Sequence, residues 1–563
     1  MKFEEMKYQR VNIEEFREKS NKIFEKLGTG NKLSDEIKAI KAFQDLSDDI
    51  ESETTIASVR NSINTLDEFY DKEIEFYDEN GPFIQEISNE YTKRLLSSDN
   101  LNELKKEFGE LLFSQEELAL KTFDPKIIED LQKENKLTTD YNKLIASAQI
   151  NYDGKVLTLS QMSPYTQNID RNIRKESSLL VSNFFETNLD EFETIYDELV
   201  RVRTSIAKKL GYDNFINLAY DRLGRTDYNS SDVSNYRKQI IEEVVPFVSE
   251  LEMRKAERLG INNPQSFDLA LSFLSGNPTP KGNREWQVKR ALEMYSEMSI
   301  ETKNFFEFML DNNLLDLDSK EGKQAGGYCT YIPKYESPFI FANFNGTSHD
   351  VDVLTHEAGH AFQVYQSRHL IPEYRWPTME AAEIHSMSME FLAWPWIDKF
   401  FEEDTDKYKF SHLAGAVTFI PYGALVDHFQ HEVYENYNLT KEERRALWRT
   451  LEKTYLPHKK YEEDKFLENG GFWFRQGHIF DGPFYYIDYT LAQVVALEYW
   501  NESRKDFDNA FNSYLSLCKL GGSKSFLGLL KTNNLSNPFK EGTIKKIFEP
   551  VKEYLNSIDD KKL

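Results

Sequence analysis

Cysteines and long apolar runs are scarce in this sequence. It contains only two cysteines, Cys329 and Cys518, which lie far apart and form no CxxC pair. A disulfide framework and a zinc site built on thiolates are therefore excluded, and the low cysteine content fits a reducing, intracellular setting. No run of 18 apolar residues occurs, and acids interrupt the N-terminal residues where a signal peptide needs an apolar stretch. We therefore expect a cytoplasmic protein that has no membrane partner.

Positive charge is also in deficit. The 563 residues include 69 Lys and Arg against 95 Asp and Glu, a formal net charge of −26 at pH 7. Such a field repels phosphate backbones, so we expect no nucleic-acid partner. What the chain does have is a 40% hydrophobic and 14% aromatic content. These values are typical of a globular protein with a substantial core and a solvated acidic surface.

Helical periodicity dominates the first 320 residues, where apolar side chains recur three and four positions apart between charged ones. One helix, capped by Asn12, is expected to end at the glycines of residues 28–30. A second long helix, starting near Ser34, is expected to stop at the Asn-Gly-Pro of residues 80–82. Long helices joined by short breaks indicate a bundle, and the Gly- and Pro-rich residues 276–283 are the best linker candidate.

Two stretches have the composition of β-structure. The Asp-Gly within residues 151–157 lies between apolar residues and predicts one small hairpin. Residues 326–333 and 338–344 are rich in β-branched and aromatic side chains bounded by Gly and Pro, which predicts two strands. The expected fold class is therefore mainly α, with a small β-sheet directly upstream of the next motif.

That motif is His-Glu-Ala-Gly-His at residues 356–360, on an amphipathic helix that Thr347 and Ser348 can cap. His356 and His360 are one helical turn apart, so their imidazoles project side by side and can share a zinc ion. Glu357 stands at the edge of the same site as a base. With 10 His in the chain, chance placement gives on the order of 0.01 such motifs. Zinc chemistry is the better explanation.

A catalytic zinc keeps one coordination position for water, so a third protein ligand is needed, usually a carboxylate from a later helix. The predicted helix over residues 378–390 supplies Glu380 and Glu383, three residues apart, and both could face the metal. Spacing favours Glu380, because its interval from His360 is the one used by thermolysin-like enzymes. Spacing alone does not settle which carboxylate is the ligand.

The motif at residues 356–360, followed by Glu383, Ser386 and Glu390, resembles the oligoendopeptidase F and thimet oligopeptidase family of zinc peptidases. In that family the third ligand is a glutamate followed three residues later by serine and seven residues later by another glutamate. Glu383 matches this pattern and Glu380 does not. The resemblance therefore implies one zinc ion per chain, held by the two motif histidines and Glu383, with Glu380 behind them.

The resemblance extends to the predicted strands of residues 326–347 and to the segment after His478. Residues 483–489, Pro-Phe-Tyr-Tyr-Ile-Asp-Tyr, are similar to the family's histidine and tyrosine segment opposite the zinc. Peptide hydrolysis builds negative charge on the former carbonyl oxygen, so donors aimed at that oxygen lower the barrier. The resemblance implies that Tyr489 is such a donor, with Tyr486, three residues before it, as a further candidate, and that His478 donates to the substrate backbone or to the intermediate and positions the chain.

The resemblance further implies a two-lobed helical body around a deep substrate channel, with an N-terminal helical lobe over residues 1–190 and a catalytic region over 191–563. The expected function is a zinc-dependent oligoendopeptidase that hydrolyses internal bonds of short peptides, with Glu357 as general base. One alternative is a zinc carboxypeptidase on a related helical scaffold, and another is a non-catalytic peptide-binding helical protein. No role follows from the sequence for His412, and the oligomeric state stays open.

Overall fold

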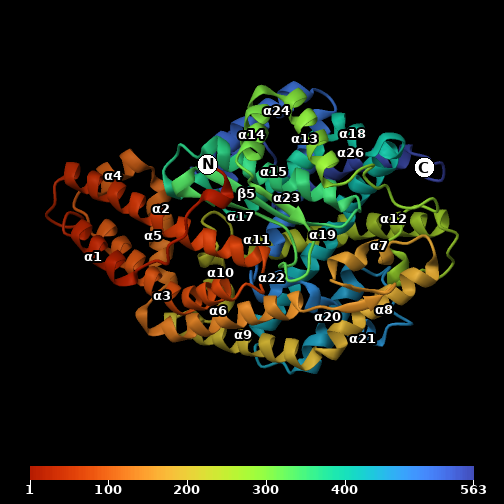
Figure 1. The fold of residues 1–563 in the computed structure, drawn as a ribbon, viewed down its shortest axis with the longest axis horizontal. Helices are drawn as coiled ribbons and strands as arrows, with labels where there is room; N and C mark the ends of the chain where they lie inside the picture. Colours follow the sequence, from red (N-terminus) through yellow and green to blue (C-terminus); the bar gives the residue numbers. More distant parts are fainter.

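The computed structural model describes residues 1–563 and is built mainly from helices, with two small β-sheets (Figure 1). The N-terminal helices are α1 (Ile13–Phe24), α2 (Leu33–Ile63), α3 (Glu68–Leu96), α4 (Leu101–Phe108), α5 (Glu110–Thr122) and α6 (Ile128–Ala146). The middle of the chain forms α7 (Ser163–Thr166), α8 (Arg171–Thr187), α9 (Leu189–Leu210), α10 (Phe215–Arg222), α11 (Ser230–Gln239), α12 (Val245–Arg258), α13 (Arg284–Met298) and α14 (Ile300–Asp311).

The C-terminal part holds the motif helix and the helices that follow it in the chain (Figure 1). These are α15 (His349–Ser367), α16 (Pro372–Arg375), α17 (Met379–Leu392), α18 (Asp398–Phe401), α19 (Thr405–Glu435), α20 (Lys441–Tyr455), α21 (Lys465–Glu468), α22 (Gly477–Phe480), α23 (Tyr486–Ser503), α24 (Phe507–Leu520), α25 (Phe526–Thr532) and α26 (Thr543–Ser557).

Helix α1 begins as predicted, since the Asn12 side chain accepts a hydrogen bond from the Glu15 backbone N–H. The predicted helix stop at residues 80–82 is wrong, because α3 continues through Pro82. Proline cannot donate to the carbonyl four residues earlier, and here that carbonyl, on Asp78, accepts instead from the Asn135 side chain of α6 at 3.2 Å. The break between the two long helices falls earlier, at residues 64–67.

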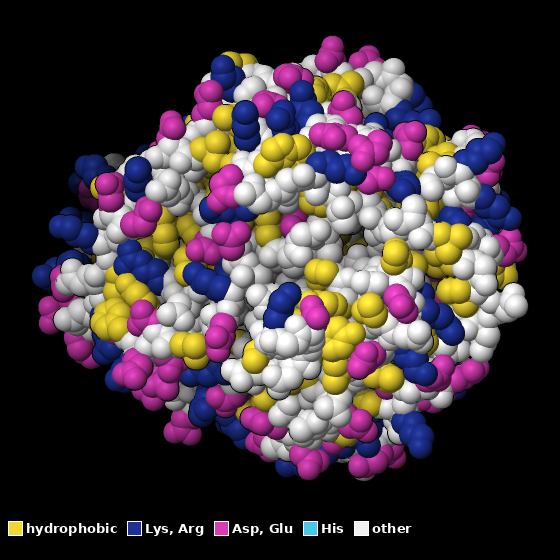
Figure 2. Space-filling model, turned by 45° about the vertical axis from the view of Figure 1, so that its right-hand side comes forward, with side chains coloured by type: hydrophobic (Ala, Val, Ile, Leu, Met, Phe, Trp, Pro, Cys, Tyr) yellow, Lys and Arg dark blue, Asp and Glu magenta, His cyan; other side chains and the backbone are white.

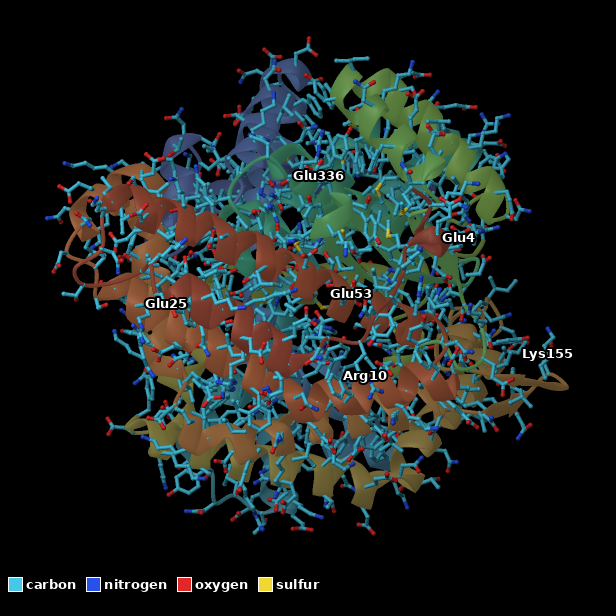
Figure 3. All side chains as sticks on the ribbon, turned by 60° about the vertical axis from the view of Figure 1, so that its left-hand side comes forward. Glu4, Arg10, Glu25, Glu53, Lys155 and Glu336 are labelled. Atoms are coloured by element: carbon cyan, nitrogen blue, oxygen red, sulfur yellow. The ribbon has the colours of Figure 1, made fainter.

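The predicted hairpin is present as β1 (Ile150–Tyr152) and β2 (Lys155–Leu157), which pair antiparallel. Its turn residues, Asp153 and Gly154, both have positive φ, as a tight hairpin requires. Lys155 marks where this hairpin projects from the body in Figure 3.

The two strands predicted before the motif helix are β4 (Tyr328–Ile332) and β5 (Ser337–Phe344), an antiparallel pair. A third strand, β3 (Leu315–Asp318), pairs parallel with β5 and was not predicted, because its alternating Leu and Asp are few and follow a helix directly. The strand order β3-β5-β4 leaves β4 at an edge.

Helix α15 packs against the strands β4 and β5 and against helix α17. The contact with α17 is very close at Gly359, where an added Cβ would lie 2.6 Å from both the His385 carbonyl oxygen and the Ser386 Cα. The glycine of the motif therefore lets α17 approach the two histidines. Helix α23 packs in turn against α17 and α19.

This arrangement confirms the predicted fold class, a mainly helical body with a small sheet beside the motif helix. The division at residues 190 and 191 falls within the first turn of α9 and stays a prediction. Both cysteines are free. No helix has the length and apolar character needed to cross a membrane. On the face seen in Figure 2, acidic and basic side chains are interspersed, without a large patch of either sign.

Candidate active site

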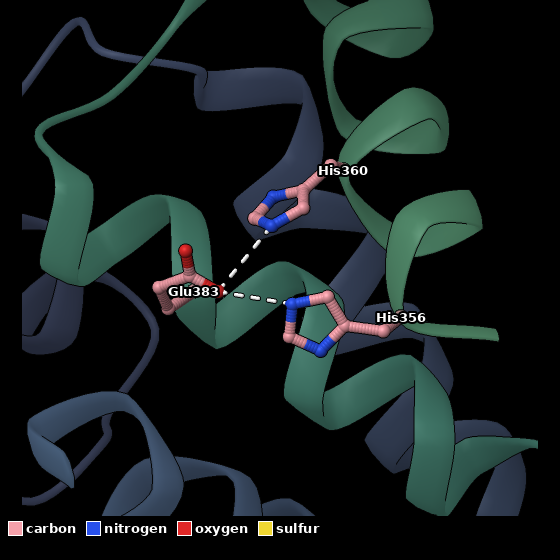
Figure 4. Close-up of side chains that lie close together, drawn as sticks. All are labelled: His356, His360 and Glu383. Carbon is pink, nitrogen blue, oxygen red and sulfur yellow. Dashed lines mark ion pairs between the residues drawn. The ribbon is translucent and has the colours of Figure 1, made fainter. Parts of the chain in front are cut away.

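Two neighbouring helices bring the predicted metal ligands together. His356 and His360 project from one face of α15, and Glu383 faces them from α17 (Figure 4). The Glu383 Oε2 atom lies 3.2 Å from His356 Nε2 and 3.3 Å from His360 Nε2. One ligand atom from each residue falls within 4.8 Å of the others. Two imidazole nitrogens and one carboxylate oxygen are a donor set that fits zinc and leaves a coordination position open.

The far side of His356 is held by a carboxylate. His356 Nδ1 lies 2.7 Å from Glu390 Oε1, and His412 Nε2 lies 2.9 Å from Glu390 Oε2. Burial raises the pKa of Glu390, but the hydrogen bonds from the two histidines outweigh it and hold that pKa at about 2. As an ionised acceptor, Glu390 keeps the proton of His356 on Nδ1, which turns the Nε2 lone pair toward Glu383. His412 was missed by sequence reasoning, because it lies on α19, remote from the motif.

Glu383 is likewise held through its own hydrogen bonds. It is buried, the Tyr485 hydroxyl donates to its Oε1, and the Ser386 hydroxyl donates to its Oε2 at 2.9 Å. Burial raises the pKa of Glu383, but the adjacent His360 and His356 hold it well below its usual range. Tyr485 was not singled out from the sequence, although it precedes Tyr486 in the tyrosine-rich segment.

Glu357 has an uncommitted carboxylate oxygen. The side chain is buried beside the two motif histidines, and its Oε2 has no hydrogen-bond partner. Burial raises the pKa of Glu357, whereas His356 and His360 lower it. Strand β4 approaches closely, since a Cβ on Gly327 would lie 3.3 Å from Glu357 Oε1. A buried carboxylate without a partner, next to an open metal position, is available to move a proton.

Glu380 does not join the group of convergent donor atoms. It is buried, and its Oε2 has no partner. Burial raises the pKa of Glu380 to about 7, and the buried Arg225 opposes that rise. His385 is also buried and packs near Cys518, whose Sγ lies 3.5 Å from its Nδ1. Neither side chain reaches the site made by the motif histidines and Glu383.

The predicted oxyanion donors lie on the wall of the same cavity. A cavity of about 480 Å³ is lined by His356 and Glu357 and also by His478, Tyr486 and Tyr489. His478 Nε2 lies 3.1 Å from the Tyr489 hydroxyl, and the ring centroids of Tyr486 and His478 are 5.0 Å apart. Burial raises the pKa of Tyr489 and of Tyr486, so both phenols keep their protons and remain donors.

Comparisons with known proteins agree with this geometry. Residues 3–123 match the sequence model of the Peptidase M3 N-terminal domain, and residues 164–548 match that of Peptidase family M3. An "Oligoendopeptidase F homolog" from Borreliella burgdorferi is 24% identical over 447 residues, which are 75% of this chain and 71% of that protein.

Solved structures are more similar still. PZ peptidase A with an inhibitor is 47% identical, has a TM-score of 0.99 and covers 100% of both chains. A crystal structure named as an oligoendopeptidase F from Bacillus anthracis is also 47% identical, has a TM-score of 0.94 and covers 100% of this chain and 99% of its own. These matches confirm the resemblance found in the sequence, and the chain belongs to peptidase family M3, a family of metallopeptidases.

Proposed function

We propose that the chain is a zinc-dependent oligoendopeptidase that hydrolyses internal bonds of short peptides, with one zinc ion held by His356, His360 and Glu383. The observation that carries this proposal is the convergence of the three donor atoms beside the uncommitted carboxylate of Glu357. Family membership and the similarity to PZ peptidase A, which was solved with an inhibitor, support it.

The residues divide the chemistry among them. When bound, zinc supplies a Lewis acid that lowers the pKa of water. Glu357 takes a proton from the attacking water and later gives it to the leaving amine. Tyr489, on the wall of the same cavity, donates a hydrogen bond to the oxygen on which negative charge develops, and Tyr486 is a second phenol within reach. His478 lies beside Tyr489 and positions the phenol and the substrate chain.

The edge strand β4 is suited to hold an extended peptide. Its partner on one side is β5, and the strand order leaves its other edge open to pairing with a substrate backbone. Gly327, just before this strand, lines the cavity and approaches Glu357. A peptide added to β4 would therefore pass the carboxylate that moves the proton.

Cleavage of an internally quenched fluorescent peptide with an amidated C-terminus tests the proposal. We expect cleavage at an internal bond, loss of cleavage with a chelator, and recovery when zinc is added back. A carboxypeptidase would leave the amidated peptide intact and trim only its free-acid counterpart. A peptide-binding protein would bind the peptide with zinc present and release no product. A folded protein substrate, which cannot enter the cavity as an extended chain, should stay uncut.

A further inference from the structure

A line of hydrogen bonds runs through the protein into the catalytic cavity and ends at Tyr489. The Tyr422 hydroxyl of α19 lies 2.7 Å from Gln476 Oε1, and Gln476 Nε2 lies 2.9 Å from His478 Nδ1. His478 Nε2 in turn lies 3.1 Å from the Tyr489 hydroxyl. All three distances are ordinary hydrogen-bond lengths. Gln476, His478 and Tyr489 also line the cavity that contains Glu357.

The orientation of the Gln476 amide determines which group donates and which accepts in each of these hydrogen bonds. An amide oxygen only accepts and an amide nitrogen only donates. With Oε1 toward Tyr422, the Tyr422 hydroxyl donates to the amide, and the structure gives that hydroxyl no other acceptor. The reversed amide would leave the Tyr422 proton unpaired within the protein, which costs free energy in a half-buried site. Gln476 therefore donates from Nε2 to His478 Nδ1.

An imidazole nitrogen that accepts a hydrogen bond carries no proton, so His478 holds its proton on Nε2. That N–H then donates to the oxygen of Tyr489. With His478 donating to its oxygen, the Tyr489 hydroxyl proton points away from His478, and its acceptors are a substrate oxygen in the cavity and the neighbouring Tyr485 oxygen. Each member of the line donates to the next, and donors in series strengthen one another.

The surroundings of His478 suit a neutral ring. Burial lowers the pKa of His478, and the carboxylates of Asp481 and Glu383 partly oppose this. The remaining neighbours are the rings of Tyr485, Tyr486 and Tyr489, whose centroids all lie within 5.4 Å of the imidazole centroid. Burial raises the pKa of these phenols, so they contribute no charge near neutral pH.

We propose that Gln476 is a positioning residue that fixes His478 as its Nε2–H tautomer and so points the Tyr489 hydroxyl proton into the cavity. This inference rests on the proposed role of Tyr489 as a donor to the oxygen on which negative charge develops. Nothing in the sequence motifs singles out Gln476, because its effect depends on Tyr422, which belongs to a distant helix.

The tautomer can be measured without any reaction. In the full-length, zinc-loaded protein carrying ¹⁵N-labelled histidine, His478 is assigned by comparison with His478→Gln. We expect the ¹⁵N shift of its Nδ1 to be that of an unprotonated nitrogen and the shift of its Nε2 to be that of a protonated one. A protonated Nδ1 in the wild-type protein would overturn the proposal. Because this readout needs no turnover, it decides the tautomer even if the protein cleaves no peptide.

The Gln476→Glu variant replaces the amide with a carboxylate of nearly the same size. It reverses the direction of hydrogen-bond donation between residue 476 and His478. A carboxylate accepts from both Tyr422 and His478, which stabilises a proton on Nδ1. When the ring is neutral, its Nε2 then accepts from Tyr489 and turns the phenol proton away from the cavity. We expect the pH profile of kcat to gain a new alkaline limb, along which kcat falls by about tenfold or more as the pH rises. KM should change little.

Gln493→Glu is the matched control, because Gln493 lines the same cavity and has no hydrogen bond to His478. It adds the same charge and should not create the alkaline limb. Tyr422→Phe gives a second variant if Gln476→Glu folds poorly, and it should produce a mixture of the two His478 tautomers. An unchanged pH profile in Gln476→Glu, or the same new limb in Gln493→Glu, would contradict the proposal.

Discussion

Two of the three proposed ligands, His356 and Glu383, are each held by a neighbouring side chain that directs one donor atom toward the other ligand. Glu390 holds His356 through Nδ1, and Tyr485 holds Glu383 through Oε1, so His356 Nε2 and Glu383 Oε2 face each other. Loss of such a partner typically weakens metal affinity by about 10–100-fold. The histidines keep the carboxylates of Glu383 and Glu390 ionised, since burial alone would raise the pKa of each.

Replacing the two candidate carboxylates one at a time tests which of them binds the metal. We expect Glu383→Ala to lower the zinc content from about one per chain to near zero, because only two protein ligands remain. Glu380→Ala is the matched control three residues away on α17, and it should keep its zinc. Metal analysis after dialysis measures both. The reverse pattern would assign the ligand to Glu380.

At the residue scale, the sequence predicted the side chains that share one local motif. His356, Glu357 and His360 are fixed by their spacing on a single helix, and that spacing follows from helix geometry. His412, Tyr485 and Gln476 were missed, because each acts on a residue of another helix: their partners are Glu390, Glu383 and Tyr422. No short sequence pattern encodes such contacts.

At the scale of secondary structure, the approach of α15 to α17 determines whether the site can assemble. Gly359 lies at the contact, with the backbone of His385 and Ser386 where a side chain would be. Interiors packed at this density do not absorb an extra methyl group without movement. Glycine at position 359 is therefore needed for the packing of α15 against α17, separately from the metal chemistry.

Gly359→Ala should push the two helices apart. We expect a loss of roughly 1–3 kcal/mol in the free energy of unfolding, and zinc affinity weakened by about tenfold or more because the ligands separate. The control is Gly415→Ala in α19, where an added Cβ meets nothing within 4 Å. It should be neutral or stabilising by about 0.5–1 kcal/mol. Thermal unfolding and zinc titration measure the effects, and a fully stable Gly359→Ala would refute the packing argument.

The elements themselves were predictable to different degrees. The hairpin and the strands β4 and β5 were found because turn residues and β-branched runs are local signals. The end of the helix at Pro82 was predicted wrongly, because the side chain of Asn135 on another helix satisfies the carbonyl that proline leaves free. The strand β3 was missed, since pairing with β5 rather than its own composition makes it a strand.

On the scale of the whole molecule, the N-terminal helices form a small core of their own that also contacts the catalytic region at α16. The Tyr374 hydroxyl accepts from the Leu112 backbone N–H at 3.0 Å, and Arg375 pairs with Asp48. Glu116 of α5 lies in this region, where it accepts from Thr92. Burial, together with the nearby carboxyl of Glu373, raises the pKa of Glu116 to about 7, although the hydrogen bond from Thr92 opposes the rise.

This largely buried carboxyl should make the free energy of unfolding depend on pH. The pKa of Glu116 is higher in the folded protein than the value of about 4.3 expected in the unfolded chain. The folded state therefore binds more protons between those two values, and stability falls as pH rises through that window. We expect Glu116→Gln to be stabilised relative to wild type, by roughly 2 kcal/mol more at pH 8 than at pH 5.

Thermal unfolding at the two pH values provides the measurement. The neighbouring Glu117 is exposed, and Glu117→Gln should unfold like the wild-type protein at both pH values. An advantage of Glu116→Gln that does not grow with pH would rule out a raised pKa at this position.

The central claim is that the three converging donors hold zinc so that Glu357 can move the proton during peptide hydrolysis. Glu357→Gln tests it most directly, because an amide of the same size cannot take a proton and is not one of the proposed ligands. Zinc content and cleavage of the quenched peptide are measured on the same sample. The variant is predicted to keep about one zinc per chain while kcat/KM falls by about 10³-fold. Substantial cleavage by zinc-loaded Glu357→Gln would contradict the account.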